Sequence, residues 1–254
     1  MSVTGTEYVD LLARELAAVV LPDGPRRRSG PDSAFASSLA AVRDDVEATA
    51  RMLRDGGLSR NPAEAGADLA AETTSLLYAA GAPHPVWRHW AGLTSLGRIL
   101  GGDRMDGCLH AVLGAEWGYA ERLGTGDPPR APLSMRVVWR LAAGGSGDPG
   151  ADPSDEVDEA WLTLLHSVPA ADHGRTEAAL RSLAEFWMEE DEDWRRFHPR
   201  SYPDFQSDVC AAAQLARRRG YAPRDLDEDA REYLEPGLVE EAPEPLPAAL
   251  SPFA

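Results

Sequence analysis

The fold is decided by one stretch of the chain, which reads Leu183-Ala-Glu-Phe-Trp-Met-Glu-Glu-Asp-Glu-Asp-Trp-Arg-Arg-Phe-His198, breaks at prolines 199 and 203, and continues as Phe205-Gln-Ser-Asp-Val-Cys-Ala-Ala-Ala-Gln-Leu-Ala-Arg-Arg-Arg-Gly220. In its first half the apolar residues recur at spacings of three and four, which predicts an amphipathic helix. In its second half an alanine-rich run ends in three arginines and a glycine, which is typical of a helix C-terminus. The stretch therefore predicts two helices joined by a proline break, with Asp204 capping the second.

The rest of the chain repeats this pattern of apolar stripes and glycine or proline breaks. We expect further helices at residues 6–21 with Thr6 as cap, 33–55, 61–81, 85–100, 103–123, 133–143, 154–168 and 225–234, although 133–143 also permits a short strand. The fold class predicted is all-α, either packed helical hairpins of a tetratricopeptide-like kind or an irregular helical bundle.

The spacing of the breaks predicts the domain organisation. We expect one helical domain at residues 1–239, with a candidate internal linker at the glycine- and proline-rich residues 144–153. Residues 240–254 are acidic and rich in proline, which predicts an extended or disordered tail.

The charge of the chain limits its partners and its chemistry. A formal net charge of −17 repels nucleic acid and anionic membranes and attracts a basic protein. There is no apolar run long enough to span a membrane and no secretory leader, so we expect a cytoplasmic protein. All 25 basic residues are arginine, which excludes the lysine of a Walker-type phosphate loop or a pyridoxal Schiff base.

Motifs for catalysis or metal binding are missing. None of the six histidines follows an acidic residue by three positions, and neither HExxH nor Gly-x-Ser-x-Gly occurs. Gly145-x-Gly147-x-x-Gly150 matches the dinucleotide fingerprint in letters, but no strand is predicted before it. Cys108 and Cys210 lie in apolar helical segments, as expected of buried free thiols. We therefore expect no metal, no cofactor and no enzymatic activity.

The C-terminal third resembles a known family. The runs Cys210-Ala-Ala-Ala-Gln-Leu-Ala-Arg-Arg-Arg-Gly220-Tyr and Tyr233-Leu-Glu-Pro-Gly-Leu238 are similar to the ending of the immunity protein 49 family of bacterial polymorphic toxin systems, although Glu235 here separates Leu234 from Pro236. The resemblance covers about a quarter of the chain. It implies a cytoplasmic antidote that binds a cognate toxin domain, which we expect to be basic, and blocks it without catalysis.

The acidic part of the opening stretch supplies the candidate contact residues. Charge complementarity around an aromatic anchor favours Glu189, Asp191, Glu192, Asp193 and Trp194 as the partner-binding surface. Glu190 differs, because the helical period places it on the aromatic face, where we expect either a buried pair with an arginine or an acid that opens into a pocket.

Two other functions remain open. One is a helical-repeat scaffold or regulator that binds a peptide or protein partner. The other is a helical enzyme that acts on a small molecule in secondary metabolism, for which distant residues would have to converge in the fold.

Overall fold

The computed structural model describes residues 3–22, 32–125, 130–145, 153–197 and 206–253, and of residues 32, 33 and 191–197 it describes the helix without the side chains. All regular structure in these ranges is helical and consists of eleven α-helices and one 3-10 turn. The predicted all-α fold is confirmed, and residues 133–142 form a helix, not a strand. No helix in the described part of the chain is long and apolar enough to cross a membrane.

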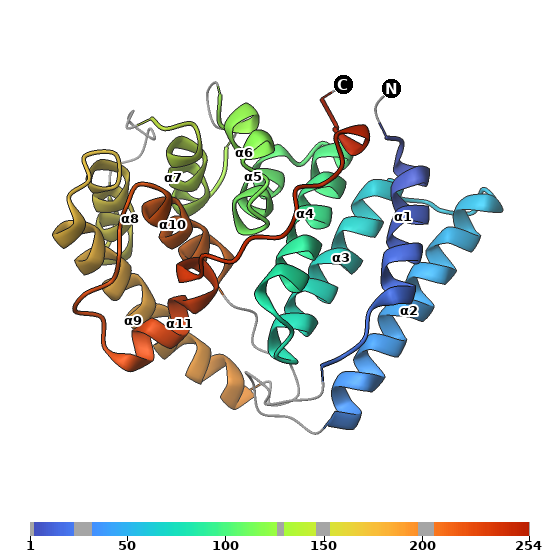
Figure 1. Cartoon of the computed structure of the whole chain (residues 1–254), viewed down its shortest axis with the longest axis horizontal. Coiled ribbons are helices and arrows are strands. Elements are labelled where there is room, and N and C mark those ends of the chain that lie inside the picture. The colour runs from blue at the N-terminus through green and yellow to red at the C-terminus, as the bar shows by residue number, and fades with distance from the viewer. Residues whose placement is uncertain (1–2, 23–31, 126–129, 146–152, 198–205, 254) are drawn as a thin grey trace. The chain divides into compact units, whose positions relative to one another are not determined.

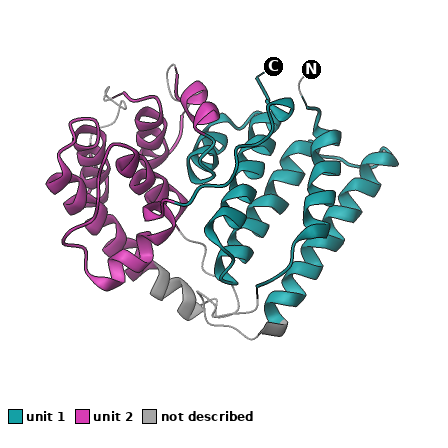
Figure 2. Ribbon diagram, viewed as in Figure 1, with its two compact units in different colours: residues 1–116, 241–254 teal, residues 117–240 magenta. Residues whose placement is uncertain are grey.

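The contacts divide the chain into two compact units, coloured separately in Figure 2. Unit 1 comprises residues 1–116 and 241–254, and unit 2 comprises residues 117–240. The single domain expected at residues 1–239 stays a prediction. Most of the expected linker at 144–153 lies outside the described residues. In the expected tail, residues 240–247 carry no helix and are followed by the 3-10 turn η1 (Ala248–Leu250).

Unit 1 is built on α1 (Gly5–Ala18), α2 (Asp32–Arg54), α3 (Pro62–Ala79), α4 (His84–Gly101) and α5 (Arg104–Leu113). Figure 1 shows α1 to α4 running alternately down and up. Each helix packs against the next, and α1 also packs against α3 and α4. The start of α3 is as expected, with Asn61 accepting a hydrogen bond from the Ala63 amide and Pro62 in the first turn.

Unit 2 contains α6 (Trp117–Gly124), α7 (Leu133–Ala142), α8 (Glu156–Ser167), α9 (His173–Phe197), α10 (Ser207–Arg218) and α11 (Glu228–Leu238). Successive helices pack from α6 to α10, and α11 packs against both α9 and α10. Arg217 and Arg218 lie in the last turn of α10 before Gly220, which has a φ of 88°, so the predicted helix end is confirmed.

Several predicted helix boundaries were wrong. The cap of α1 is Thr4, not Thr6, because Thr4 and Glu7 form a capping box in which each side chain binds the other's backbone amide. Helix α10 begins at Ser207 with Gln206 at its cap; the predicted cap, Asp204, lies outside the described residues.

The helix expected at residues 103–123 is two helices. Helix α5 ends at Leu113, and Ala115 has a φ of 59°. The amides of Ala115 and Glu116 donate back to the carbonyls of Val112 and Ala111, which is the hydrogen-bond pattern of a Schellman motif. The break was missed because an alanine, not a glycine, occupies the left-handed position.

Tyr8 fixes how three helices of unit 1 pack. Its ring is fully buried, and its hydroxyl donates to the carbonyl of Leu93 in α4 at 2.8 Å. Gly66 in α3 and Gly97 in α4 make room for the ring, since a Cβ at these positions would lie 2.8 Å from Tyr8 Cε1 and 2.5 Å from Tyr8 Oη. Because real Cβ atoms do not approach that closely, the two glycines are required by the tyrosine.

We expect Gly97→Ala to lower the free energy of unfolding by about 2–3 kcal/mol, because the added methyl group displaces the Tyr8 ring and breaks its hydrogen bond. The midpoint of denaturant unfolding measures the loss. Gly118→Ala is the control: a Cβ there meets no atom within 4 Å, so this variant should be unchanged or more stable by up to about 1 kcal/mol. An unchanged midpoint for Gly97→Ala would contradict the packing described.

Candidate partner-binding surface

Helix α9 carries the predicted contact residues. Its inner face consists of Leu180, Leu183 and Ala184, all fully buried, while Phe186 and Trp187 are half-buried and meet edge to face with ring centroids 5.1 Å apart. Between residues 186 and 190 the side chains of α9 are therefore only half-buried or exposed.

The structure places one of the five predicted contact residues completely. Glu189 is exposed, as a contact residue must be. Asp191, Glu192, Asp193 and Trp194 lie in α9, but their side chains are outside the described residues.

The first of the two expectations for Glu190 was wrong. Its side chain is exposed, so it is not buried against an arginine, whereas the alternative that it opens into a pocket stays a prediction. The helical period puts it on the aromatic face, but that face is already half-open at Trp187, one turn earlier.

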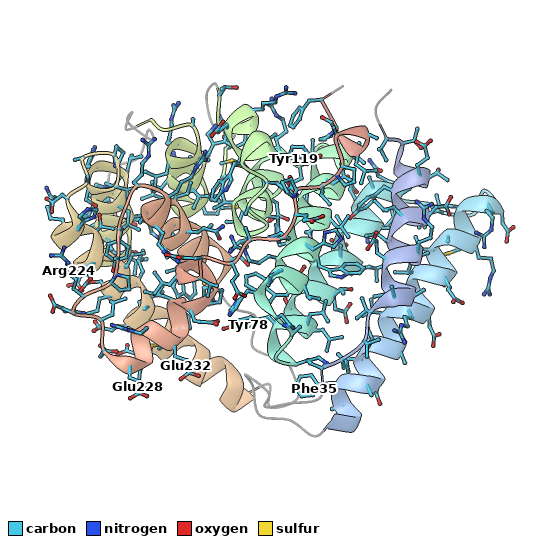
Figure 3. The ribbon with its side chains drawn as sticks, in the orientation of Figure 1. Phe35, Tyr78, Tyr119, Arg224, Glu228 and Glu232 are labelled. Carbon is cyan, nitrogen blue, oxygen red and sulfur yellow. The ribbon has the colours of Figure 1, made fainter. Side chains whose placement is uncertain are left out.

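Helix α11 adds a second group of acids beside α9. Asp227 caps α11 by accepting from the Ala230 amide at 2.7 Å, and Glu228 and Asp229 occupy the first turn, where acids are favoured by the helix dipole. Glu228, Asp229 and Glu232 are exposed. Figure 3 shows Glu228 and Glu232 projecting from the same side of the helix.

These acids differ from Glu121 and Glu240 of unit 2, which form ion pairs with arginine. Within the described part of the chain, no ion pair is made by the exposed carboxylates of α9 and α11, which we call the acidic α9–α11 surface: Glu185, Glu189, Glu190, Glu228, Asp229 and Glu232. In contrast, Arg217 pairs with Glu240 at 2.5 Å and Arg218 with Glu121 at 2.7 Å. The acidic surface therefore keeps its negative charge available to a partner.

Buried Glu177 joins α9 to the segment before α11. Its carboxylate accepts hydrogen bonds from the amides of Arg224 and Asp225 at 2.8 and 2.6 Å and from the hydroxyl of Tyr221 at 3.1 Å. Arg181, one turn later in α9, donates to the carbonyl of Asp225. These bonds, which we call the Glu177 clamp, hold the chain just before α11 against α9 and so fix the position of the first turn of α11 and its acids.

The clamp also sets the ionisation of Glu177. Burial alone raises the pKa of this carboxyl, but the two amide donors, the Tyr221 hydroxyl and the charge of Arg181 outweigh burial and hold its pKa below the ordinary value. Tyr221 responds in the opposite direction, because burial and the neighbouring carboxylate raise the pKa of its phenol.

Sequence reasoning missed Glu177, although a signal was present. Glu177 lies three residues before Leu180 and six before Leu183, on the inner face of α9. An inward position correctly indicates burial for Glu177, although it did not for Glu190, and a buried carboxylate requires hydrogen-bond donors.

No metal centre is present in the residues that the structure describes, since no three His, Cys, Asp or Glu side chains converge there. His84 accepts a hydrogen bond from the indole of Trp87 at 3.2 Å, and His89 lies 3.5 Å from the carboxylate of Glu15. Both free cysteines are buried, as expected, and burial raises the pKa of the Cys108 thiol to about 12.

We expect Glu177→Gln to lower the free energy of unfolding by about 1–3 kcal/mol at pH 7, because a neutral amide is a weaker acceptor for two backbone N–H groups. A carboxyl with a lowered pKa stabilises the fold above its unfolded-state pKa, and that contribution is lost as the pH falls through the folded pKa. The difference from the parent chain should therefore shrink below about pH 4.5 in denaturant unfolding. Glu185→Gln, on the exposed side of α9, is the control; an equal effect of both variants would contradict the clamp.

Comparison with known proteins found no relative of this chain. No protein-family model matches the chain, and neither the curated proteins nor the solved structures contain a match.

Proposed function

We propose that this protein is a non-catalytic immunity protein that binds a basic toxin domain in the cytoplasm and blocks it by covering its working surface with the acidic α9–α11 surface. The observation that carries the proposal is the set of exposed, unpaired carboxylates on two helices that pack against each other. The class of partner comes from the resemblance to the immunity protein 49 family.

The electrostatics of the surface suit fast capture of a basic partner. Unpaired like charges produce a negative potential that steers an oppositely charged protein and raises the association rate, an effect that salt weakens. A nuclease-like toxin has a basic substrate surface of this kind, and carboxylates placed there also repel the nucleic acid that the toxin would bind.

Aromatic residues beside the acids supply the apolar part of such an interface. Phe186 and Trp187 are half-buried on α9, one turn or less before Glu189 and Glu190. Half-buried aromatic residues surrounded by charges are typical of the anchors that contribute most to protein–protein affinity. The bonds of Glu177 hold the start of α11 against α9, so this part of the surface does not have to be ordered when the partner binds.

The proposal is tested by charge reversal on α11. The chain is co-expressed with the toxin domain encoded by the neighbouring gene, and growth rescue and co-purification are measured. We expect Glu228→Lys with Glu232→Lys to lower the association rate at least about tenfold at low salt and to abolish rescue. Protection by neither the parent chain nor the variant, with no co-purification, would refute the proposed function.

A matched control separates the local surface from the net charge. Asp44 and Asp45 are exposed acids on α2 of unit 1, and reversing both to lysine changes the charge by the same amount. This variant should rescue growth as well as the parent chain. If it fails equally, the overall charge, and not the acidic α9–α11 surface, controls binding.

A further inference from the structure

The segment 241–253 belongs to unit 1, although it follows unit 2 in the sequence. Its prolines at 243, 245 and 247 lack an N–H and fix φ at about −65°, which favours an extended chain over a helix. Figure 1 shows this segment in red as it passes α4 and α5. A small number of contacts bind it there.

Arg88 of α4 holds the start of the segment. Only 2% of this arginine is exposed, and its Nη1 donates to the carbonyl oxygen of Glu241 at 2.6 Å. Its Nε donates to the carbonyl of Leu113 at 2.9 Å, at the C-terminal end of α5. The guanidinium is thus oriented by the fold of unit 1, and one of its donors is used on the main chain of the segment.

Glu116 holds the segment five residues later. Its Oε1 accepts a hydrogen bond from the amide of Leu246 at 2.7 Å, and the residue is only 7% exposed. The turn after α5 positions this glutamate, because its own amide donates to the carbonyl of Ala111 at 2.8 Å. Burial raises the pKa of Glu116, against the opposing effects of the Leu246 amide and of nearby His89.

Leu246 is the anchoring side chain. It is 7% exposed, whereas its neighbours Pro245 and Pro247 are exposed. Gly92 of α4 lies against both residues: a Cβ there would be tight against Glu116 Cγ, at 3.3 Å, and in van der Waals contact with Leu246 Cδ1, at 3.7 Å, so a larger side chain would meet the leucine. We call the residues Arg88, Gly92 and Glu116 the tail site.

The tail site has the chemistry of a site for extended peptides. It forms hydrogen bonds with one backbone carbonyl and one backbone amide, groups that every peptide possesses, and it buries one leucine that lies between two prolines. Prolines keep a peptide extended before it binds and so reduce the entropy lost on binding. The carboxylates of Glu241 and Glu244 remain exposed.

We propose that the tail site is a peptide-binding site which the chain's own C-terminal segment occupies, and that an extended segment of a partner protein, with a leucine between two prolines, binds there in its place. The proposal is independent of toxin binding, because its residues all lie in unit 1. The attached tail competes at a high effective concentration, so an outside peptide gains access when the tail's leucine is released.

The test uses a fluorescein-labelled peptide with the sequence of residues 240–253 and the full-length chain. In the full-length variant Leu246→Glu, the carboxylate cannot occupy the leucine position beside Glu116, and the site is vacated. We expect the peptide to bind this variant at least tenfold more tightly than the parent chain, as measured by fluorescence anisotropy. A peptide that carries the same Leu246→Glu change should bind the variant chain at least tenfold more weakly. Adding Gly92→Val to the variant chain should likewise weaken its binding of the unchanged peptide at least tenfold.

The proposal is overturned if the peptide binds the parent chain and a helical, folded Leu246→Glu chain alike, or binds neither. If that variant does not fold, hydrogen exchange of the Leu246 amide in the parent chain decides: excess peptide should lower its protection at least tenfold, and unchanged protection rejects exchange. Concentration-dependent dimers that keep this amide protected, with no displacement by the peptide, would assign the site to the tail of a second copy and refute a partner peptide.

Discussion

Glu177 lies on the inward face of α9, where a carboxylate stays ionised only if hydrogen-bond donors surround it. Unit 2 supplies the donors from a segment more than forty residues later in the chain, namely the amides of Arg224 and Asp225 and the hydroxyl of Tyr221. A donor set of this kind is directional, so it fixes both the position and the orientation of the backbone before α11. The acids in the first turn of α11 lie beside α9 because Glu177 holds the backbone that precedes them.

In unit 1 the positions of the helices are fixed by a close steric fit. Tyr8 reaches α4 because Gly66 and Gly97 carry no side chain, and its hydroxyl finds the carbonyl of Leu93. Small residues that admit a large ring leave one arrangement of helices, since any other would create either a void or an overlap. The two units thus depend on different interactions, a charged hydrogen-bond cluster in one and a close steric fit in the other.

The sequence predicted the helices far better than their ends or their buried polar contacts. Apolar periodicity is a property of a segment, so it located α9 and α10, and Asn61-Pro62 marked the start of α3 correctly. The break after α5 depends on Ala115 in a left-handed conformation that alanine disfavours, and no local signal marks it. Periodicity also could not tell Glu177 from Glu190, because it gives the direction of a side chain and not whether another element covers it. Of the five predicted contact residues, only Glu189 has a described side chain, and it is exposed. No sequence signal marked Tyr221 and Arg224 as partners of α9.

Glu177 holds the start of α11 in place, whereas Glu116 holds the C-terminal segment that we propose to be exchangeable. The donors around the two carboxylates explain this difference. Several donors surround Glu177 and lower its pKa, so its ionised form is stabilised by the fold. Glu116 receives one amide hydrogen bond, and burial still raises its pKa, so its negative charge is incompletely compensated. A carboxylate in that state binds any well-placed N–H favourably, but a single hydrogen bond and one leucine do not select strongly for the sequence that provides them. The contacts that hold the C-terminal segment are therefore general enough for another peptide to reproduce, whereas those that hold the start of α11 are not.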